Sequence, residues 1–80
     1  MKVKVLFFGV AKDISKVNSL DLELTRDSSV MDFLQILKER YSGFTAINDF
    51  SIAVNEEYAK SDVILSEADV VAIIPPVSGG

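Results

Sequence analysis

The sequence predicts an α+β fold in which a mixed sheet of about five strands carries one main helix on one face. Three features indicate it: apolar segments of strand-like composition near both ends, one middle segment with helical spacing, and short strand-like segments between them. Because 80 residues provide room for a single core, we expect one domain. We place this domain at residues 1–74 and an extended tail at residues 75–80.

The first two strands are predicted to form an antiparallel pair. Residues 2–8 alternate with a period of two and contain β-branched and aromatic side chains, and residues 20–24 alternate leucine with acidic residues. The segment 9–18 joins them, and we expect Lys12 and Asp13 to lie in an exposed loop there.

The main helix follows. Ser28 or Ser29 can cap its start, Asp32 lies in its first turn, and Lys38 with Arg40 and the following Gly43 mark its end. Its apolar residues recur at helical spacing and form one stripe that should lie across the sheet: Val30, Phe33, Leu34, Leu37 and Tyr41.

The segment after the helix is predicted to be irregular at first and then to form a hairpin. Residues 44–50 show no clear period. Residues 51–54 and 58–60 flank a turn that Asn55 opens, which indicates two short strands.

The end of the domain contains a central strand. Residues 63–65 form a brief apolar plug, and residues 66–69 form a turn. Residues 70–74 are apolar on both faces, as expected for a strand in the middle of a sheet.

Alternation assigns the side chains of the first and the last predicted strand to two faces of the sheet. The helix should cover one set, Val3, Val5, Phe7, Val71 and Ile73. The other set would form an apolar surface, to which Tyr58 could be added: Leu6, Phe8, Val70, Ala72 and Ile74. Such a surface commonly marks a protein partner; alternatively, a loop covers it or its residues are ordinary exposed hydrophobics.

The composition argues against most classes of catalytic mechanism and against nucleic-acid and metal binding. The chain has no cysteine and no histidine, so thiolate nucleophiles, imidazole bases and soft metal ligands are absent, and we expect no metal site. The carboxylate pairs Glu56 with Glu57 and Glu67 with Asp69 are better explained as solvated turn residues than as an acid and a base. The net charge is -4 and the basic residues are scattered, which argues against nucleic-acid binding.

We also expect no membrane segment, because no apolar run approaches the ~20 residues that a spanning helix needs. The apolar stretch near the start is too short for a signal peptide. A cytoplasmic location is therefore expected.

The tail is the most plausible working part. Pro75 and Pro76 favour a stiff extended stem, and Gly79 and Gly80 lack a Cβ, so a narrow site in a partner can close around them. The carboxylate of Gly80 then becomes the reactive group. Alternatively, the two glycines are an ordinary flexible chain end.

Three segments resemble a known family over essentially the whole chain: Val5-Leu6-Phe7-Phe8, Ala53-Val54-Asn55, and the finish from Asp69 to Gly80 with Pro-Pro-Val-Ser-Gly-Gly. They are similar to the MoaD family, the small subunits of molybdopterin synthase, which have a ubiquitin-like β-grasp fold. Sulfur carriers of the thiazole pathway share the fold and the Gly-Gly but typically lack the diproline. The family often has Arg-Glu where this chain has Lys12-Asp13; the charges are the same, but a lysine cannot reproduce the bidentate contacts of a guanidinium.

The resemblance implies a sulfur carrier. An E1-like (MoeB-like) enzyme would use ATP to adenylate Gly80, a sulfur donor would convert it to a thiocarboxylate, and the large synthase subunit (MoaE-like) would receive the tail. There the sulfur would enter the dithiolene of molybdopterin, made from cyclic pyranopterin monophosphate. The chain itself would bind no cofactor. The residues expected to enter the partner are Pro75, Pro76, Val77, Ser78 and Gly79, and those expected to contact its surface are Leu6, Phe8, Lys12, Tyr58 and Ile74.

Three further functions stay open at this point. The chain could be a ubiquitin-like modifier joined to lysines through Gly80, a sulfur carrier of the thiazole pathway, or a plain interaction module that uses its outer sheet face and has a passive tail.

Overall fold

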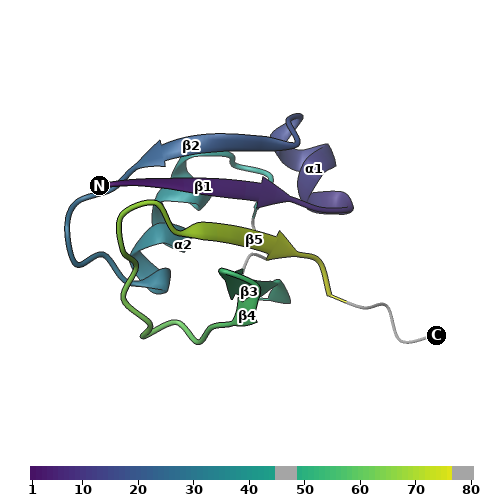
Figure 1. Cartoon of the computed structure of the whole chain (residues 1–80). Helices are drawn as coiled ribbons and strands as arrows, with labels where there is room; N and C mark the ends of the chain where they lie inside the picture. Colours follow the sequence, from purple (N-terminus) through teal and green to yellow (C-terminus); the bar gives the residue numbers. More distant parts are fainter. Residues whose placement is uncertain (45–48, 77–80) are drawn as a thin grey trace.

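The computed structural model describes residues 1–44 and 49–76, and within them the chain forms a five-stranded mixed sheet and two helices (Figure 1). In chain order the elements are β1 Lys2–Phe7, α1 Val10–Ser15, β2 Ser19–Glu23, α2 Val30–Arg40, β3 Ser51–Val54, β4 Glu57–Tyr58 and β5 Val70–Ile74. In this part of the chain no helix is long and apolar enough to cross a membrane.

The strand order in the sheet is β2-β1-β5-β3-β4. β1 pairs with β5 in parallel and with β2 antiparallel, and β3 pairs antiparallel with both β5 and β4. The predicted β1–β2 pair and the central position of β5 are confirmed. Because β1 and β5 run in the same direction, both end at the same edge of the sheet, where β5 leads into the tail (Figure 1).

The core lies between the sheet and α2, which crosses behind the sheet in Figure 1. All five side chains that alternation assigned to the helix face are buried, as are Val30, Phe33 and Leu37 of α2. Phe44 is fully buried, and its ring stacks on Phe7 with 6.2 Å between the centroids. Most of the predicted connection at residues 44–50 lies outside the described residues.

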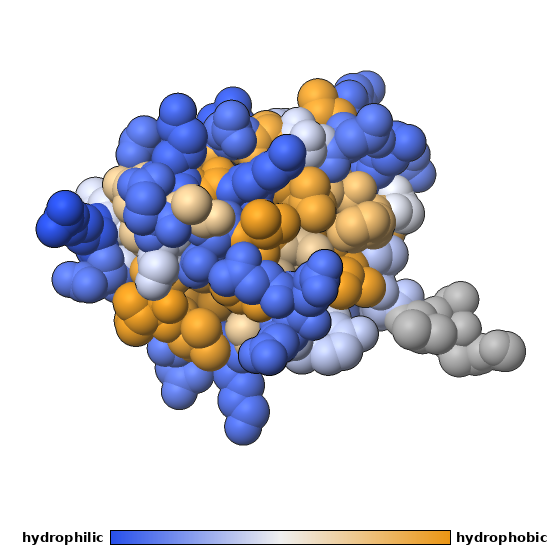
Figure 2. Space-filling model, in the orientation of Figure 1, coloured by the Kyte–Doolittle hydropathy of each residue, from blue (hydrophilic) through white to orange (hydrophobic). Residues whose placement is uncertain are grey.

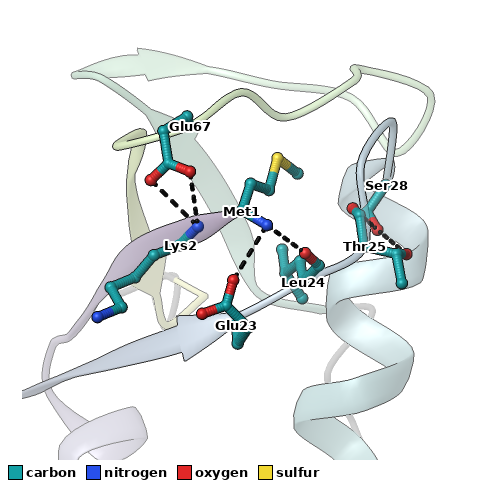
Figure 3. Close-up of polar contacts among 7 residues, drawn as sticks. All are labelled: Met1, Lys2, Glu23, Leu24, Thr25, Ser28 and Glu67. Atoms are coloured by element: carbon teal, nitrogen blue, oxygen red, sulfur yellow. Dashed lines mark hydrogen bonds and ion pairs between the residues drawn. The ribbon is translucent and has the colours of Figure 1, made fainter.

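The start of α2 is fixed by reciprocal hydrogen bonds. The Ser29 hydroxyl accepts from the Asp32 amide at 3.1 Å, and the Asp32 carboxylate accepts from the Ser29 amide at 3.0 Å. Of the two serines proposed as caps, Ser29 therefore does so. Ser28 is buried instead and donates to the Thr25 carbonyl at 2.8 Å (Figure 3).

The prediction of a loop at Lys12 and Asp13 was wrong, because both residues lie in α1, although both are exposed as expected. Ala11 is fully buried and anchors this short helix to the sheet. Its N-cap residue is Gly9, which provides no side-chain hydrogen bond, and its C-cap residue is Lys16, whose φ is 67°. α1 thus lacks the capping serine or aspartate that usually reveals a helix in a sequence.

The hairpin is confirmed with a shifted second strand. β4 is Glu57–Tyr58 and not residues 58–60, because Asn55 and Glu56 both have positive φ and make a two-residue turn of the kind that matches strand twist. The prediction that residues 63–65 form a brief apolar plug was only partly right. Leu65 is buried, whereas Val63 is 36% exposed and Ile64 is 54% exposed.

At the end of the sheet opposite the tail, polar contacts join the start of β1 to the end of β2 and to the loop before β5 (Figure 3). The Met1 amine donates to the Leu24 carbonyl at 2.7 Å and pairs with the Glu23 carboxylate at 3.0 Å. The Lys2 amide donates to both carboxylate oxygens of Glu67, at 3.3 and 3.2 Å. These contacts fix the pairing at one end of the strands, and the tail follows β5 at the other end.

Candidate functional site

The site begins where β5 ends. Phe7 lies opposite Ile73 in the parallel register, and the Phe8 amide donates to the Ile73 carbonyl at 3.3 Å. This places the end of β1 beside Ile74 and Pro75, at the root of the tail. Pro75 is partly buried and Pro76 is exposed, whereas Val77, Ser78, Gly79 and Gly80 lie outside the described residues.

The face of the sheet away from α2 carries an apolar hollow of about 590 Å³ next to this root. All five residues that alternation assigned to this face contribute to it, and Tyr58 does too, as the sequence suggested. Its lining is Leu6, Phe8, Ala53, Asn55, Glu56, Tyr58, Val70, Ala72 and Ile74. Phe8 is 48% exposed and Tyr58 is 79% exposed, so within the described residues no loop covers the hollow.

Charge and apolar surface are separated along the strands of this face. Near the start of β1, Lys2 lies opposite Glu23 and Lys4 opposite Asp21, so cationic and anionic side chains are neighbours across the two strands. Farther along β1 the outward residues become apolar. Figure 2 shows hydrophobic side chains on the sheet face in view, toward the end of β5, and a second group at the lower left. The apolar hollow therefore runs along β5 and reaches the end of the sheet from which the tail leaves.

Asn55 shapes one side of the hollow and ties the β3–β4 turn to the start of β5. Its backbone amide donates to the Val70 carbonyl at 2.8 Å, and its side-chain oxygen accepts from the Val70 amide at 3.0 Å. Its side-chain amide donates to the Asp69 carboxylate at 2.9 Å. The sequence pattern indicated Asn55 as a turn residue. Its hydrogen bonds to Val70 and Asp69 join segments far apart in the chain and could not be predicted from the local pattern.

Lys12 lies apart from the apolar hollow. It lines a neighbouring hollow of about 520 Å³ together with Lys4, Gly9 and Ser19, and Leu6 and Phe8 line both hollows. Of the predicted contact residues, the structure therefore brings Leu6, Phe8, Tyr58 and Ile74 together around one hollow, and places Lys12 on the other side of the Leu6–Phe8 ridge.

The carboxylates of the described residues are structural or scattered. Glu67 accepts from the Lys2 amide, and Asp69 accepts from the Ser66 amide at 2.8 Å and from Asn55. Glu56 is exposed at the edge of the apolar hollow, while Glu57 belongs to β4. Residues 1–44 and 49–76 contain no group of three or more acidic, histidine or cysteine side chains that could hold a metal ion.

Comparison with known proteins agrees with this architecture. The model of the ThiS family matches residues 5–80. This chain belongs to the ThiS family. A relative from Chlamydomonas reinhardtii named molybdopterin synthase sulfur carrier subunit is 34% identical to this ThiS-family chain and is matched over the full length of both chains.

Two solved structures extend the comparison of this ThiS-family member. A Pyrococcus furiosus protein assigned as molybdopterin converting factor subunit 1 is 31% identical with a TM-score of 0.88, over 96% of this chain and 99% of the other. A complex of subunits 1 and 2 of the molybdopterin-converting factor from Helicobacter pylori has a chain that is 26% identical with a TM-score of 0.70, over the whole of both chains. The predicted MoaD resemblance and the ubiquitin-like β-grasp fold are thereby confirmed.

Proposed function

We propose that this chain is the sulfur-carrier subunit of a molybdopterin synthase and that Gly80 carries the sulfur. The observation that supports this most strongly is the full-length match with a relative of that name, because the tail lies inside the matched region. The geometry supports it independently. The stem of the tail leaves the domain beside an exposed apolar hollow, so one partner can bind the domain and receive the tail together.

The chemistry that we propose needs only the terminal carboxylate from this chain. The Gly80 carboxylate attacks the α-phosphate of ATP on an E1-like enzyme, and pyrophosphate leaves. A persulfide of the donor then attacks the activated carbonyl, and AMP leaves, which gives an acyl disulfide. A second thiol of the donor attacks the donor sulfur of that disulfide, so the donor leaves as a disulfide and Gly80 as the thiocarboxylate. The thiocarboxylate supplies its sulfur to cyclic pyranopterin monophosphate in the large subunit. ATP is bound by the activating enzyme, and this chain contributes no general base and no cofactor.

The apolar hollow is the docking surface in this proposal. Phe8 and Tyr58 are large and exposed there, and aromatic side chains are frequent anchors in protein interfaces. Six residues from Pro75 to Gly80 span at most roughly 20 Å, which limits how far the receiving active site can lie from the hollow. Docking therefore fixes where the carbonyl is delivered, and the partner's groups carry out the reaction.

Activation would use the same stem. The E1-like enzyme must also hold Gly80 in a closed site, and the net charge of -4 would favour association with a basic partner surface. Under this proposal the whole cycle takes place in the cytoplasm with the activating enzyme, the sulfur donor and the large subunit.

Mass spectrometry tests the proposal directly. The chain is co-expressed with an E1-like enzyme and a sulfur donor, and its intact mass should show one carboxyl oxygen replaced by sulfur. A variant lacking Gly80 is the control and should stay unmodified. If the parent chain is never thiolated by activators that thiolate another member of the family, the proposal is wrong.

The same samples separate the alternatives. A modifier would appear as Gly80 in isopeptide linkage to lysines of other proteins. A thiazole-pathway carrier would be thiolated but would not form the dithiolene with a large synthase subunit and cyclic pyranopterin monophosphate. A plain interaction module would keep its function after loss of Gly79 and Gly80.

A further inference from the structure

Gly9 occupies an unusual position between β1 and α1. Its φ is 54° and its ψ is -129°, a conformation that residues with a Cβ rarely adopt. Its carbonyl accepts from the Lys12 amide at 3.0 Å, and the neighbouring Phe8 carbonyl accepts from the Ala11 amide at 3.0 Å. Because α1 holds it on one side and β1 on the other, Gly9 has little freedom to move.

Gly9 also lies against the root of the tail. A Cβ built on Gly9 would lie 2.9 Å from Cγ and 3.8 Å from Cδ of Pro75. Carbon atoms pack at about 3.5 to 4.0 Å, so the shorter distance leaves no room for a side chain. The proline ring thus rests on bare backbone just beyond the last β1–β5 hydrogen bond, from the Phe8 amide to the Ile73 carbonyl.

The position of the Pro75 ring also determines the direction of the residues that follow it. Proline fixes its own φ, so Pro75 cannot absorb a displacement by rotating about that bond, and Pro76 follows with the same restriction. A push on the Pro75 ring would therefore change the direction in which the stem leaves the sheet. The other glycine of the described residues, Gly43, is crowded to a similar degree, but by α1 and not by the tail: its Cβ would lie 2.8 Å from Cγ2 of Ile14.

We propose that Gly9 is a positioning residue for the tail. Because Gly9 has no side chain, the Pro75 ring can pack directly against its backbone, and this contact sets the direction in which the stem reaches the partner. This inference rests on the proposed sulfur-carrier function and deepens it. Gly9 takes no part in the chemistry and acts only through Pro75. A side chain at position 9 lowers the rate of sulfur transfer while the apolar hollow still docks.

The test must separate the contact with Pro75 from backbone strain at Gly9, since both oppose a side chain there. Four variants do so: Gly9→Ala, Pro75→Ala, the double variant, and Gly43→Ala as a control that crowds α1 through Ile14. Each is made with a Gly80 thiocarboxylate by intein cleavage with sulfide, which bypasses the activating enzyme. Affinity for the large subunit is measured by calorimetry, and transfer to cyclic pyranopterin monophosphate is measured in single turnovers at saturating subunit.

We expect Gly9→Ala to slow transfer by roughly 10- to 100-fold, the scale that a misplacement of about 1 Å produces, with unchanged affinity for the large subunit. Backbone strain would act equally in both backgrounds, whereas a clash with the ring disappears with the ring. The effect of Gly9→Ala must therefore be smaller in the Pro75→Ala background. Gly43→Ala should transfer at the parent rate. Equal effects in both backgrounds, or normal transfer by Gly9→Ala, would overturn the proposal.

Two further readouts keep the result decisive. If Gly9→Ala does not fold, Pro75→Ala alone decides, because it removes the seated ring and leaves Gly9 and α1 intact: transfer at the parent rate would refute the inference. NMR of the free domain needs no sulfur chemistry. The parent should show a nuclear Overhauser contact between Gly9 Hα and the Pro75 ring, and Gly9→Ala should alter the Cα–Hα residual dipolar couplings of Pro75 and Pro76. Failure of the parent to transfer sulfur would refute the proposed function. The residual dipolar couplings would still test whether Gly9 positions Pro75.

Discussion

Phe7 is the last residue of β1 and Phe8 follows it, and their side chains lie on opposite faces of the sheet. This neighbouring pair of the same residue type permits a matched test of the open face. Phe7 is 3% exposed, packs edge-on against Tyr41 and stacks on Phe44, whereas Phe8 is 48% exposed beside the hollow. Truncating a buried phenylalanine costs about 3 to 5 kcal/mol. Complete burial of such a side chain contributes ~1.5 to 3 kcal/mol, so the half-exposed Phe8 should contribute about 1 kcal/mol to folding.

Thermal unfolding and binding together give the assay. A domain of this size loses ~4 to 8 °C in Tm per kcal/mol, so Phe7→Ala should lower Tm by at least roughly 12 °C, and Phe8→Ala by less than about 8 °C. Phe8→Ala should instead weaken binding to the large synthase subunit, by about tenfold for each 1.4 kcal/mol of lost contact. If Phe8→Ala destabilised the domain as much as Phe7→Ala and left binding unchanged, the assignment of Phe8 to an open docking face would be wrong.

Three further changes test other parts of the structure. Ile74→Asp places a charge in the apolar hollow, so binding to the large subunit should be lost while circular dichroism still reports a folded domain; an unfolded variant would contradict the assigned face. Ser29→Ala removes the hydroxyl that caps α2 and should cost about 1 kcal/mol in urea unfolding, whereas Ser51→Ala on the exposed end of β3 should be neutral. Asn55→Gly keeps the positive φ and the backbone hydrogen bond to Val70 but loses the side-chain hydrogen bonds to Asp69 and to the Val70 amide, and it should cost roughly 1 to 3 kcal/mol; an unchanged midpoint would show that these side-chain hydrogen bonds add no net stability.

The strands and their faces could be predicted because alternation with a period of two is a local property of the sequence. It correctly separated Phe7 from Phe8, and it placed β5 in the centre because both faces of that segment are apolar. α1 could not be predicted in this way. With six residues it is too short for a helical period, and its start at Gly9 has no capping side chain.

The site was predictable only in part for a related reason. The apolar hollow follows from alternation once the strand order is known, and the sequence indicated most of its lining. The separate place of Lys12 depends on α1, and the contact of Gly9 with Pro75 depends on a parallel pairing between the first and the last strand. Interactions between segments so far apart in the chain leave no signal in a local pattern.

The place of β5 also determines when the sheet can be completed during synthesis of the chain. β5 is the last strand in sequence but the middle one in the sheet, and without it the β1–β2 pair and the β3–β4 pair share no strand contact. Pairings between distant segments form late, so the sheet can be completed only after β5 has left the ribosome. The strand that completes the fold is the one that leads into the tail. A chain interrupted before β5 therefore has neither the complete sheet with its apolar hollow nor the tail.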